Sequence, residues 1–123
     1  MKLQPEQREM IAIFDWIRWN KLDKFIWHTA NERRCSVQHG SILKRMGVKA
    51  GVVDISIARA RNGYHGAFIE VKVGKNSPTE TQIEFMKTMN EEGYFTKTVW
   101  GAEAAIHAIM EYLYYQGTPS SSS

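Results

Sequence analysis

Three charged residues, Asp54, Glu70 and Lys72, lie inside segments that otherwise have the composition of β-strands. Asp is disfavoured in a strand interior, and a charged group among residues that favour burial needs a partner or a metal ion. Two carboxylates that converge from paired strands form an oxygen-rich site of the kind that Mg²⁺ or Mn²⁺ prefers. Such an ion can activate water, and a neighbouring ammonium can offset charge that develops on phosphorus. The three residues therefore predict a site for metal-assisted phosphodiester hydrolysis.

The alternation of the segment 66–73 separates its charged groups from the core. Side chains in a strand point to opposite faces in turn, so Glu70 and Lys72 share one face, about 6.5–7 Å apart along the strand. The carbonyl of Val71 lies between them and is a candidate further metal ligand. The alternative interpretation is a cross-strand ion pair on a solvated face, with Asp54 a strand-end residue. The opposite face is wholly apolar and is expected to face the core: Ala67, Ile69, Val71 and Val73.

Hydrophobic periodicity and turn residues define the elements that must hold these groups. Helices are predicted over 5–20, 36–46 and 102–115, and strands over 24–28, 52–57, 66–73 and 94–99. Asn62-Gly63 is a turn signal in the loop between the second and third strands. The fold class is therefore α/β, with one mixed central sheet flanked by helices. The last strand is expected to lie parallel to the one before it, through a right-handed crossover.

One more helix is predicted between the last two strands from its end signals. Ser77 is the expected N-cap, Pro78 the first helical residue, and Glu80 the partner of Ser77 in a capping box. Gly93 is expected to end the helix. Its buried stripe is expected to contain Ile83, Met86 and Met89.

The length and composition fit one domain. The chain has 123 residues, of which 43% are hydrophobic, and this is enough for a single core. We expect that domain to occupy 1–117 and the serine-rich segment 118–123 to be disordered. A single cysteine, Cys35, cannot form an internal disulfide, and no apolar run approaches the ~20 residues of a membrane span. A cytoplasmic protein is the simplest expectation.

Basic residues are concentrated in one part of the chain. Between Arg18 and Arg61 there are ten lysines and arginines against three acidic residues, whereas the remainder has six basic and ten acidic residues. Such a segment suits a polyanion, and an ordinary solvated surface explains it about equally well. The candidate nucleic-acid contacts are Arg33, Arg34, Lys44, Arg45 and Lys49.

The runs MGVKAGVVD at 46–54 and FIEVK at 68–72, followed by 77–82 and by Gly93-Tyr94, resemble the VRR-NUC domain. This family is a branch of the PD-(D/E)xK nuclease superfamily, and its stand-alone members include phage proteins. The resemblance extends from about 28 to 113. It implies a restriction-endonuclease-like fold for this chain.

By this resemblance Asp54 and Glu70 are metal ligands and Lys72 is the catalytic lysine. Gln82 would match a family glutamine that faces the site, and Glu6 the family's N-terminal acidic residue. On spacing alone, Gln82 and Glu6 would be ordinary residues of helix surfaces. The family usually has proline where this chain has Val53. Because proline supplies no ligand, the chemistry should survive this departure.

The function expected from these observations is that of a Mg²⁺- or Mn²⁺-dependent, structure-specific DNA endonuclease. The resemblance suggests a homodimer that resolves four-way (Holliday) junctions, a reaction of DNA repair, with Tyr112, Tyr114 and Tyr115 as candidates for the interface. The alternatives are a non-catalytic DNA-binding module of the same fold, a site-specific restriction-type nuclease, and an enzyme acting on another phosphate ester. Zinc is not expected, because the four histidines lack the spacing of zinc ligands: His28, His39, His65 and His107.

Overall fold

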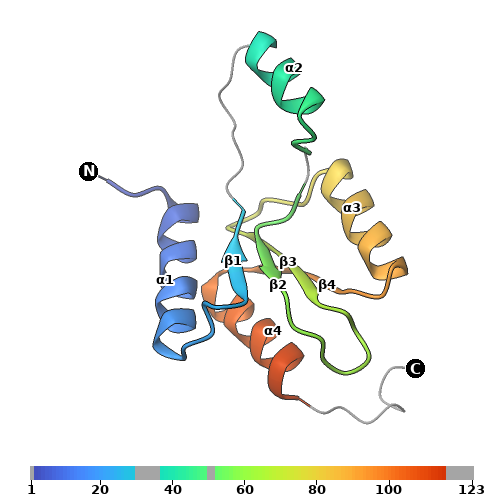
Figure 1. Ribbon diagram of the computed structural model, residues 1–123. Coiled ribbons are helices and arrows are strands. Elements are labelled where there is room, and N and C mark those ends of the chain that lie inside the picture. The colour runs from blue at the N-terminus through green and yellow to red at the C-terminus, as the bar shows by residue number, and fades with distance from the viewer. Residues whose placement is uncertain (1, 30–36, 50–51, 116–123) are drawn as a thin grey trace.

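The protein is an α/β domain with four helices and four strands in the described residues, which in this computed structural model are 2–29, 37–49 and 52–115 (Figure 1). The elements follow in the order α1 (Pro5–Trp19), β1 (Ile26–His28), α2 (Val37–Arg45), β2 (Ile55–Ile57), β3 (Ala67–Lys72), α3 (Glu80–Glu91), β4 (Phe95–Trp100) and α4 (Ala102–Tyr114). This is the predicted order, and the predicted fold class is confirmed. The predicted tail, 118–123, lies outside the described residues.

The four strands form one mixed sheet in the order β1-β2-β3-β4. β1 and β2 are antiparallel, as are β2 and β3, with Ile55 opposite Ile69. β3 and β4 are parallel, as predicted, and α3 connects them. Glu70 and Lys72 therefore lie at the carboxyl end of β3, and Asp54 directly precedes the amino end of its antiparallel neighbour β2.

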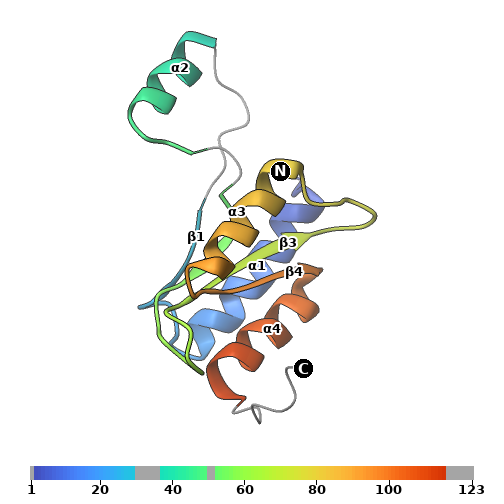
Figure 2. The ribbon, with the colours of Figure 1, turned by 90° about the vertical axis from the view of Figure 1, so that its right-hand side faces the viewer.

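Helices cover both faces of the sheet. α1 and α4 lie on one face and α3 lies on the other (Figure 2). The main core lies between the sheet and the α1–α4 layer, and its fully buried large side chains include Ile13, Ile17, Ile55, Ile69, Ile109 and Tyr112. On the other face, Phe85 of α3 packs edge-on against Phe68, with ring centroids 5.3 Å apart. The predicted buried stripe of α3 is wrong, because Ile83 is 54% exposed and Met86 and Met89 are only partly buried, while Phe85 packs against the sheet.

α3 begins later than predicted. The expected cap with Ser77, Pro78 and Glu80 is wrong, because Thr79 is the N-cap and the helix starts at Glu80. The Thr79 hydroxyl accepts a hydrogen bond from the Gln82 N–H at 3.2 Å, and Gln82 Oε1 accepts one from the Thr79 N–H at 3.0 Å. This reciprocal pair is a complete capping box two residues further along the chain.

The sheet has two chemically different ends. At the site end, the upper end in Figure 1, the residues that precede β2 meet the carboxyl end of β3. At the loop end, the segment 58–66 joins β2 to β3 and lies beside the C-terminus of α4. Asn62 and Gly63 have positive φ angles of 52° and 85°, and Arg61 and Tyr64 pair across them, so the predicted turn is confirmed.

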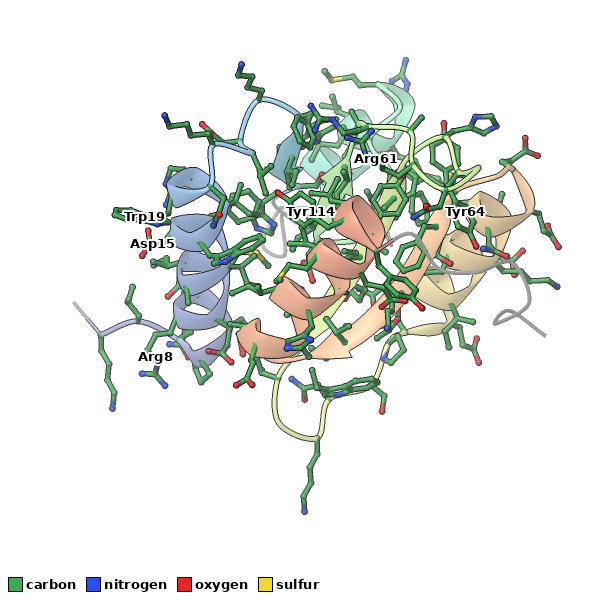
Figure 3. The ribbon with its side chains drawn as sticks, turned by 90° about the horizontal axis from the view of Figure 1, so that it is seen from below. Arg8, Asp15, Trp19, Arg61, Tyr64 and Tyr114 are labelled. Carbon is green, nitrogen blue, oxygen red and sulfur yellow. The ribbon has the colours of Figure 1, made fainter. Side chains whose placement is uncertain are left out.

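The loop end is fixed by side chains that bond the last carbonyls of α4. Asn62 Nδ2 donates to two of these carbonyls, at 3.4 and 3.0 Å, and Arg61 Nε donates to a third at 3.3 Å. Arg61, Tyr64 and Tyr114 are seen together at this end in Figure 3. Carbonyls at a helix C-terminus have no intrahelical partner, so these bonds satisfy them. The three carbonyls belong to Tyr112, Leu113 and Tyr115.

α2 stands apart from the three layers, beyond the site end of the sheet (Figures 1 and 2). It ends at Arg45, and Gly47 has the positive φ of 92° that suits its predicted role as a stop. No helix in the described part of the chain combines the length and apolar character needed to cross a membrane.

Candidate active site

Asp54 ends the pairing between β2 and β3 by inserting its side chain. Its Oδ2 accepts a hydrogen bond from the Val71 N–H at 2.9 Å. The carboxylate thereby takes the place of the backbone carbonyl that would accept this bond if β2 continued its pairing with β3. The strand predicted over 52–57 is therefore shortened to Ile55–Ile57. The backbone N–H of Asp54 donates in turn to Glu70 Oε1 at 3.2 Å. These two contacts join the predicted acidic residues directly.

Glu70 is the most deeply buried charged residue of the site. It is 2% exposed, and its Oε2 forms an ion pair of 2.8 Å with Lys72 Nζ. Burial raises the pKa of the Glu70 carboxyl, and the neighbouring Asp54 carboxylate raises it further, while the hydrogen bond and charge of Lys72 oppose this shift. The net direction is upward, so the contacts with Lys72 do not fully offset the cost of burying the Glu70 carboxylate beside Asp54.

Two neighbouring carboxylates fit a divalent cation. An ion held between Asp54 and Glu70 would favour the ionised form of Glu70, which burial now opposes. Among the described residues, no group of three or more His, Cys, Asp and Glu side chains forms a metal cluster. Mg²⁺ is commonly bound through one or two carboxylates, with water and substrate phosphates completing its shell. The donor set therefore suits this ion.

The carbonyl of Val71 faces the same place. The Gly66 carbonyl accepts a hydrogen bond from the Phe95 N–H of β4, and the Lys72 carbonyl accepts one from the N–H of Gly101, which follows β4. The even-numbered carbonyls of this strand therefore point toward β4. The N–H of Val71 points the opposite way, to Asp54, and in a strand the carbonyl of a residue follows its N–H. Pairing with β2 has ended at this level, so this carbonyl is directed toward the two acidic residues.

A cleft of about 830 Å³ opens over these groups. Its walls come from residues along α1 from its first turn to its last, from β1, from the end of β3 and from the first turn of α3. Asp54, Glu70 and Lys72 all line it, so the structure brings the three predicted residues together in one accessible cavity. Its other polar side chains are Gln4, Glu6, Gln7, Arg18, His28, Asn76 and Gln82.

The two residues assigned only by resemblance, Glu6 and Gln82, also line the cleft. Glu6 is exposed in the first turn of α1, where the helix dipole favours a carboxylate. Gln82 Oε1 is bonded to the N-cap of α3, and its amide nitrogen is the part of the side chain left to face a substrate. Both placements agree with roles at the site, and those roles remain predictions.

Three of the five basic residues predicted to bind nucleic acid are described by the structure, and they lie outside the cleft. Lys44 and Arg45 are exposed in the last turn of α2, at the site end of the sheet. Lys49 is exposed and lines a separate cavity beside α3. Arg33 and Arg34 lie outside the described residues.

His28 is a site residue that the sequence did not indicate. Its Nδ1 lies 2.8 Å from the carbonyl oxygen of Asp54, and its ring lines the cleft. The spacing of the histidines argued against zinc and gave no other signal. A contact between residues so far apart in the sequence follows only from the pairing of β1 with β2.

Comparison with known proteins places this geometry in a family. The chain is similar to a solved structure described as a VRR_NUC domain protein, with 30% sequence identity and a TM-score of 0.79. The match covers 92% of this chain and 91% of that one. No family model matches the sequence, and no curated protein matches it. On the identity and coverage of the structural match, this chain belongs to the VRR-NUC domain family and is a nuclease-type domain.

Proposed function

We propose that this protein is a Mg²⁺- or Mn²⁺-dependent endonuclease that hydrolyses phosphodiester bonds in DNA. The observation that carries the proposal is the pairing of Asp54 and Glu70 at the strand ends, with the amine of Lys72 2.8 Å from Glu70. Membership of the VRR-NUC family supports a nuclease and supports DNA as the substrate. The same arrangement of acids and lysine is what the resemblance to PD-(D/E)xK nucleases implies.

Asp54 and Glu70 would hold the ion, and the carbonyl of Val71 is directed so that it can add a third oxygen. The ion, when bound, would polarise the scissile phosphodiester and make a water molecule more acidic. Asp54 is fixed for this task because one carboxylate oxygen already accepts the Val71 N–H, which restricts the orientation of the other.

Lys72 has two roles in this proposal. Its ammonium group lowers the cost of burying the Glu70 carboxylate. Once Glu70 is engaged as a ligand, the Lys72 amine is released to orient the attacking water and to offset charge on the phosphoryl oxygens. Lys72 is only 13% exposed, so these interactions take place in a partly desolvated site where they are stronger than in bulk water.

α2 is the proposed DNA-binding arm, because Lys44 and Arg45 are exposed on it at the site end of the sheet. Contacts of this kind bind phosphate without reading sequence. Replacing both residues with alanine should weaken DNA binding and reduce the slope of log K against log salt by about 2. Titration of labelled DNA at several salt concentrations measures this slope, and an unchanged slope would remove α2 from the interface.

The finer proposal is a homodimer that resolves four-way junctions. A junction presents two symmetrically placed strands, and a C₂ dimer would place one site at each. Tyr114 and Tyr115 are both 58% exposed and are available to such an interface. Tyr112 is not available, since it is buried and its hydroxyl bonds the Arg59 carbonyl. Sedimentation of the free protein tests the dimer, and a monomer at all concentrations would contradict it.

The catalytic proposal is tested by incubating the protein with plasmid, single-stranded and four-way-junction DNA in Mg²⁺ and in Mn²⁺. Asp54→Asn keeps an acceptor for the Val71 N–H but removes a charge, so it should abolish cleavage and retain DNA binding. Glu111→Gln is its control, because Glu111 is an exposed acid on α4 whose partner, Lys97, does not line the cleft. Failure of the wild-type protein to cut any of these substrates with either ion would refute the proposal and leave a DNA-binding module.

A further inference from the structure

The carbonyl of Asp54 accepts from two donors, one at the end of β1 and one on the residue that follows it. The Thr29 N–H donates to it at 2.8 Å, and the ring Nδ1 of His28 lies at the same distance, 2.8 Å. The backbone bond continues the antiparallel pairing of β1 with β2. The bond from His28 is additional to that pairing, because it uses a side chain.

This contact defines the tautomer of His28. A carbonyl oxygen can only accept, so Nδ1 must carry the hydrogen that lies between the two atoms. The side chain is exposed, and its ring centroid lies 6.4 Å from that of Phe14, which packs against the core. The imidazole is therefore a donor to the backbone of Asp54 at the edge of the cleft.

The backbone of Asp54 needs such a donor because the sheet does not hold it on both sides. Its N–H points to Glu70, whereas its carbonyl points to β1, and in a regular strand the two groups of a residue point the same way. Asp54 thus lies at a bend before a strand of three residues. A single bond from Thr29 leaves rotation about that bond possible, and a second donor restricts it.

We propose that His28 is a positioning residue for the candidate metal site, acting through its hydrogen bond to the Asp54 carbonyl to set the direction of the Asp54 carboxylate. The inference rests on the proposed function, because it assigns His28 a role only if Asp54 binds an ion. Residues that orient metal ligands in this way typically affect metal affinity about 10–100-fold. Their effect on folding is smaller, since Thr29 still satisfies the carbonyl when His28 is replaced.

Two variants separate the hydrogen bond from the bulk of the ring. His28→Leu retains an apolar side chain of similar size and removes the donor. His28→Asn restores a donor at the right place, because Asn Nδ2 is attached to Cγ as His Nδ1 is. The control is Asn90→Ala, which removes an exposed side-chain bond to a backbone carbonyl, that of Tyr94 at 3.1 Å, far from the site.

The measurement is Mn²⁺ binding by titration calorimetry, with thermal unfolding of each metal-free variant alongside. We expect His28→Leu to weaken Mn²⁺ binding about tenfold or more, His28→Asn to recover to within about threefold of wild type, and Asn90→Ala to leave it unchanged. Equal Mn²⁺ affinity in His28→Leu and wild type would overturn the inference. So would an equal loss in His28→Leu and His28→Asn, since the donor would then be irrelevant.

A second readout separates failure of this inference from failure of the proposed function. Nitrogen chemical shifts of the neutral His28 ring should show hydrogen on Nδ1. Hydrogen on Nε2 would mean that the bond to Asp54 is absent, and the inference would fail even if the protein cuts DNA. If wild type binds no Mn²⁺ while the Nδ1–H form is observed, the proposed function fails and the role of His28 fails with it.

Discussion

The two ends of the sheet use the same kind of contact for opposite purposes. At the loop end, Asn62 and Arg61 donate to carbonyls at the C-terminus of α4 that would otherwise lack partners. At the site end, Asp54 and Glu70 accept from backbone N–H groups, but folding buries their charges close together. One end stabilises the fold, whereas the other retains negative charge at a cost in stability. Such a cost in stability is expected where charged side chains are kept in order to bind a ligand.

The largest expected effect is on catalysis, from neutralising the buried acid. Glu70→Gln keeps the shape of the side chain and an oxygen for the Asp54 N–H, but it removes a proposed metal ligand. Cleavage in Mg²⁺ should fall about 10³-fold or more, a loss of about 4 kcal/mol of transition-state stabilisation. Single-turnover cleavage of a labelled junction measures this. Cleavage within tenfold of wild type would show that the two ends do not differ in function.

The next effect is stabilisation of the site end by its proposed ligand. At a Mn²⁺ concentration 100 times its dissociation constant, the free energy of unfolding should rise by about 2.7 kcal/mol. Glu70→Gln should show little of this gain, because it lacks one of the two carboxylates. Urea unfolding with and without Mn²⁺ provides the comparison. An equal gain in both proteins would place the ion elsewhere.

A smaller effect is expected at the loop end. Asn62→Ala removes two hydrogen bonds at the C-terminus of α4, and at a φ of +52° it replaces an asparagine, which tolerates the left-handed region, with an alanine, which does not. Together these changes should lower the free energy of unfolding by about 2 kcal/mol. Cleavage per folded molecule should not change, because the loop end contributes no residue to the cleft. Urea unfolding and cleavage below the midpoint measure both. Loss of cleavage without loss of stability would contradict the division between the two ends.

The smallest expected effect is a gain in the stability of the metal-free protein from Glu70→Gln, the substitution that removes a proposed metal ligand. Because burial raises the pKa of Glu70, the folded protein favours the neutral carboxyl, which Gln imitates, more than the unfolded chain does. Metal-free Glu70→Gln should therefore unfold at a temperature at least about 2 °C above wild type at pH 7. A lower unfolding temperature would mean that the ion pair with Lys72 outweighs the cost of burial.

The pH dependence of this gain follows from the direction of the shift. Between the ordinary value of 4.5 and its raised pKa, Glu70 binds its proton more tightly in the folded state than in the unfolded state. Lowering the pH through this window therefore stabilises wild type relative to Glu70→Gln, and the advantage of the variant should shrink. An advantage that grows toward acidic pH would contradict the raised pKa.

The sequence predicted most of the fold and the centre of the site because both depend on local periodicity. Alternation within 66–73 is enough to place Glu70 and Lys72 on one face, and the confirmed turn at Asn62-Gly63 joins their strand to the one that Asp54 precedes. The parallel placement of β4 followed from the intervening helix in the same way.

The features that the sequence did not predict depend on which of several possible hydrogen-bond partners a group takes in the folded protein. Two possible caps precede α3, and both are good by composition. The one built on Thr79 and Gln82 is formed because its reciprocal bonds are complete. The early end of β2 at Ile55 could not be foreseen, since it results from a carboxylate of Asp54 replacing a backbone partner. The place of His28 likewise depends on strand pairing rather than on any motif.

The central claim is that Asp54 and Glu70 share one divalent ion. Anomalous diffraction from crystals grown with Mn²⁺ tests it directly. The account predicts one peak within about 2.0–2.3 Å of a carboxylate oxygen from each residue. A peak bound to neither residue, or two carboxyl groups turned away from each other in the presence of Mn²⁺, would contradict it.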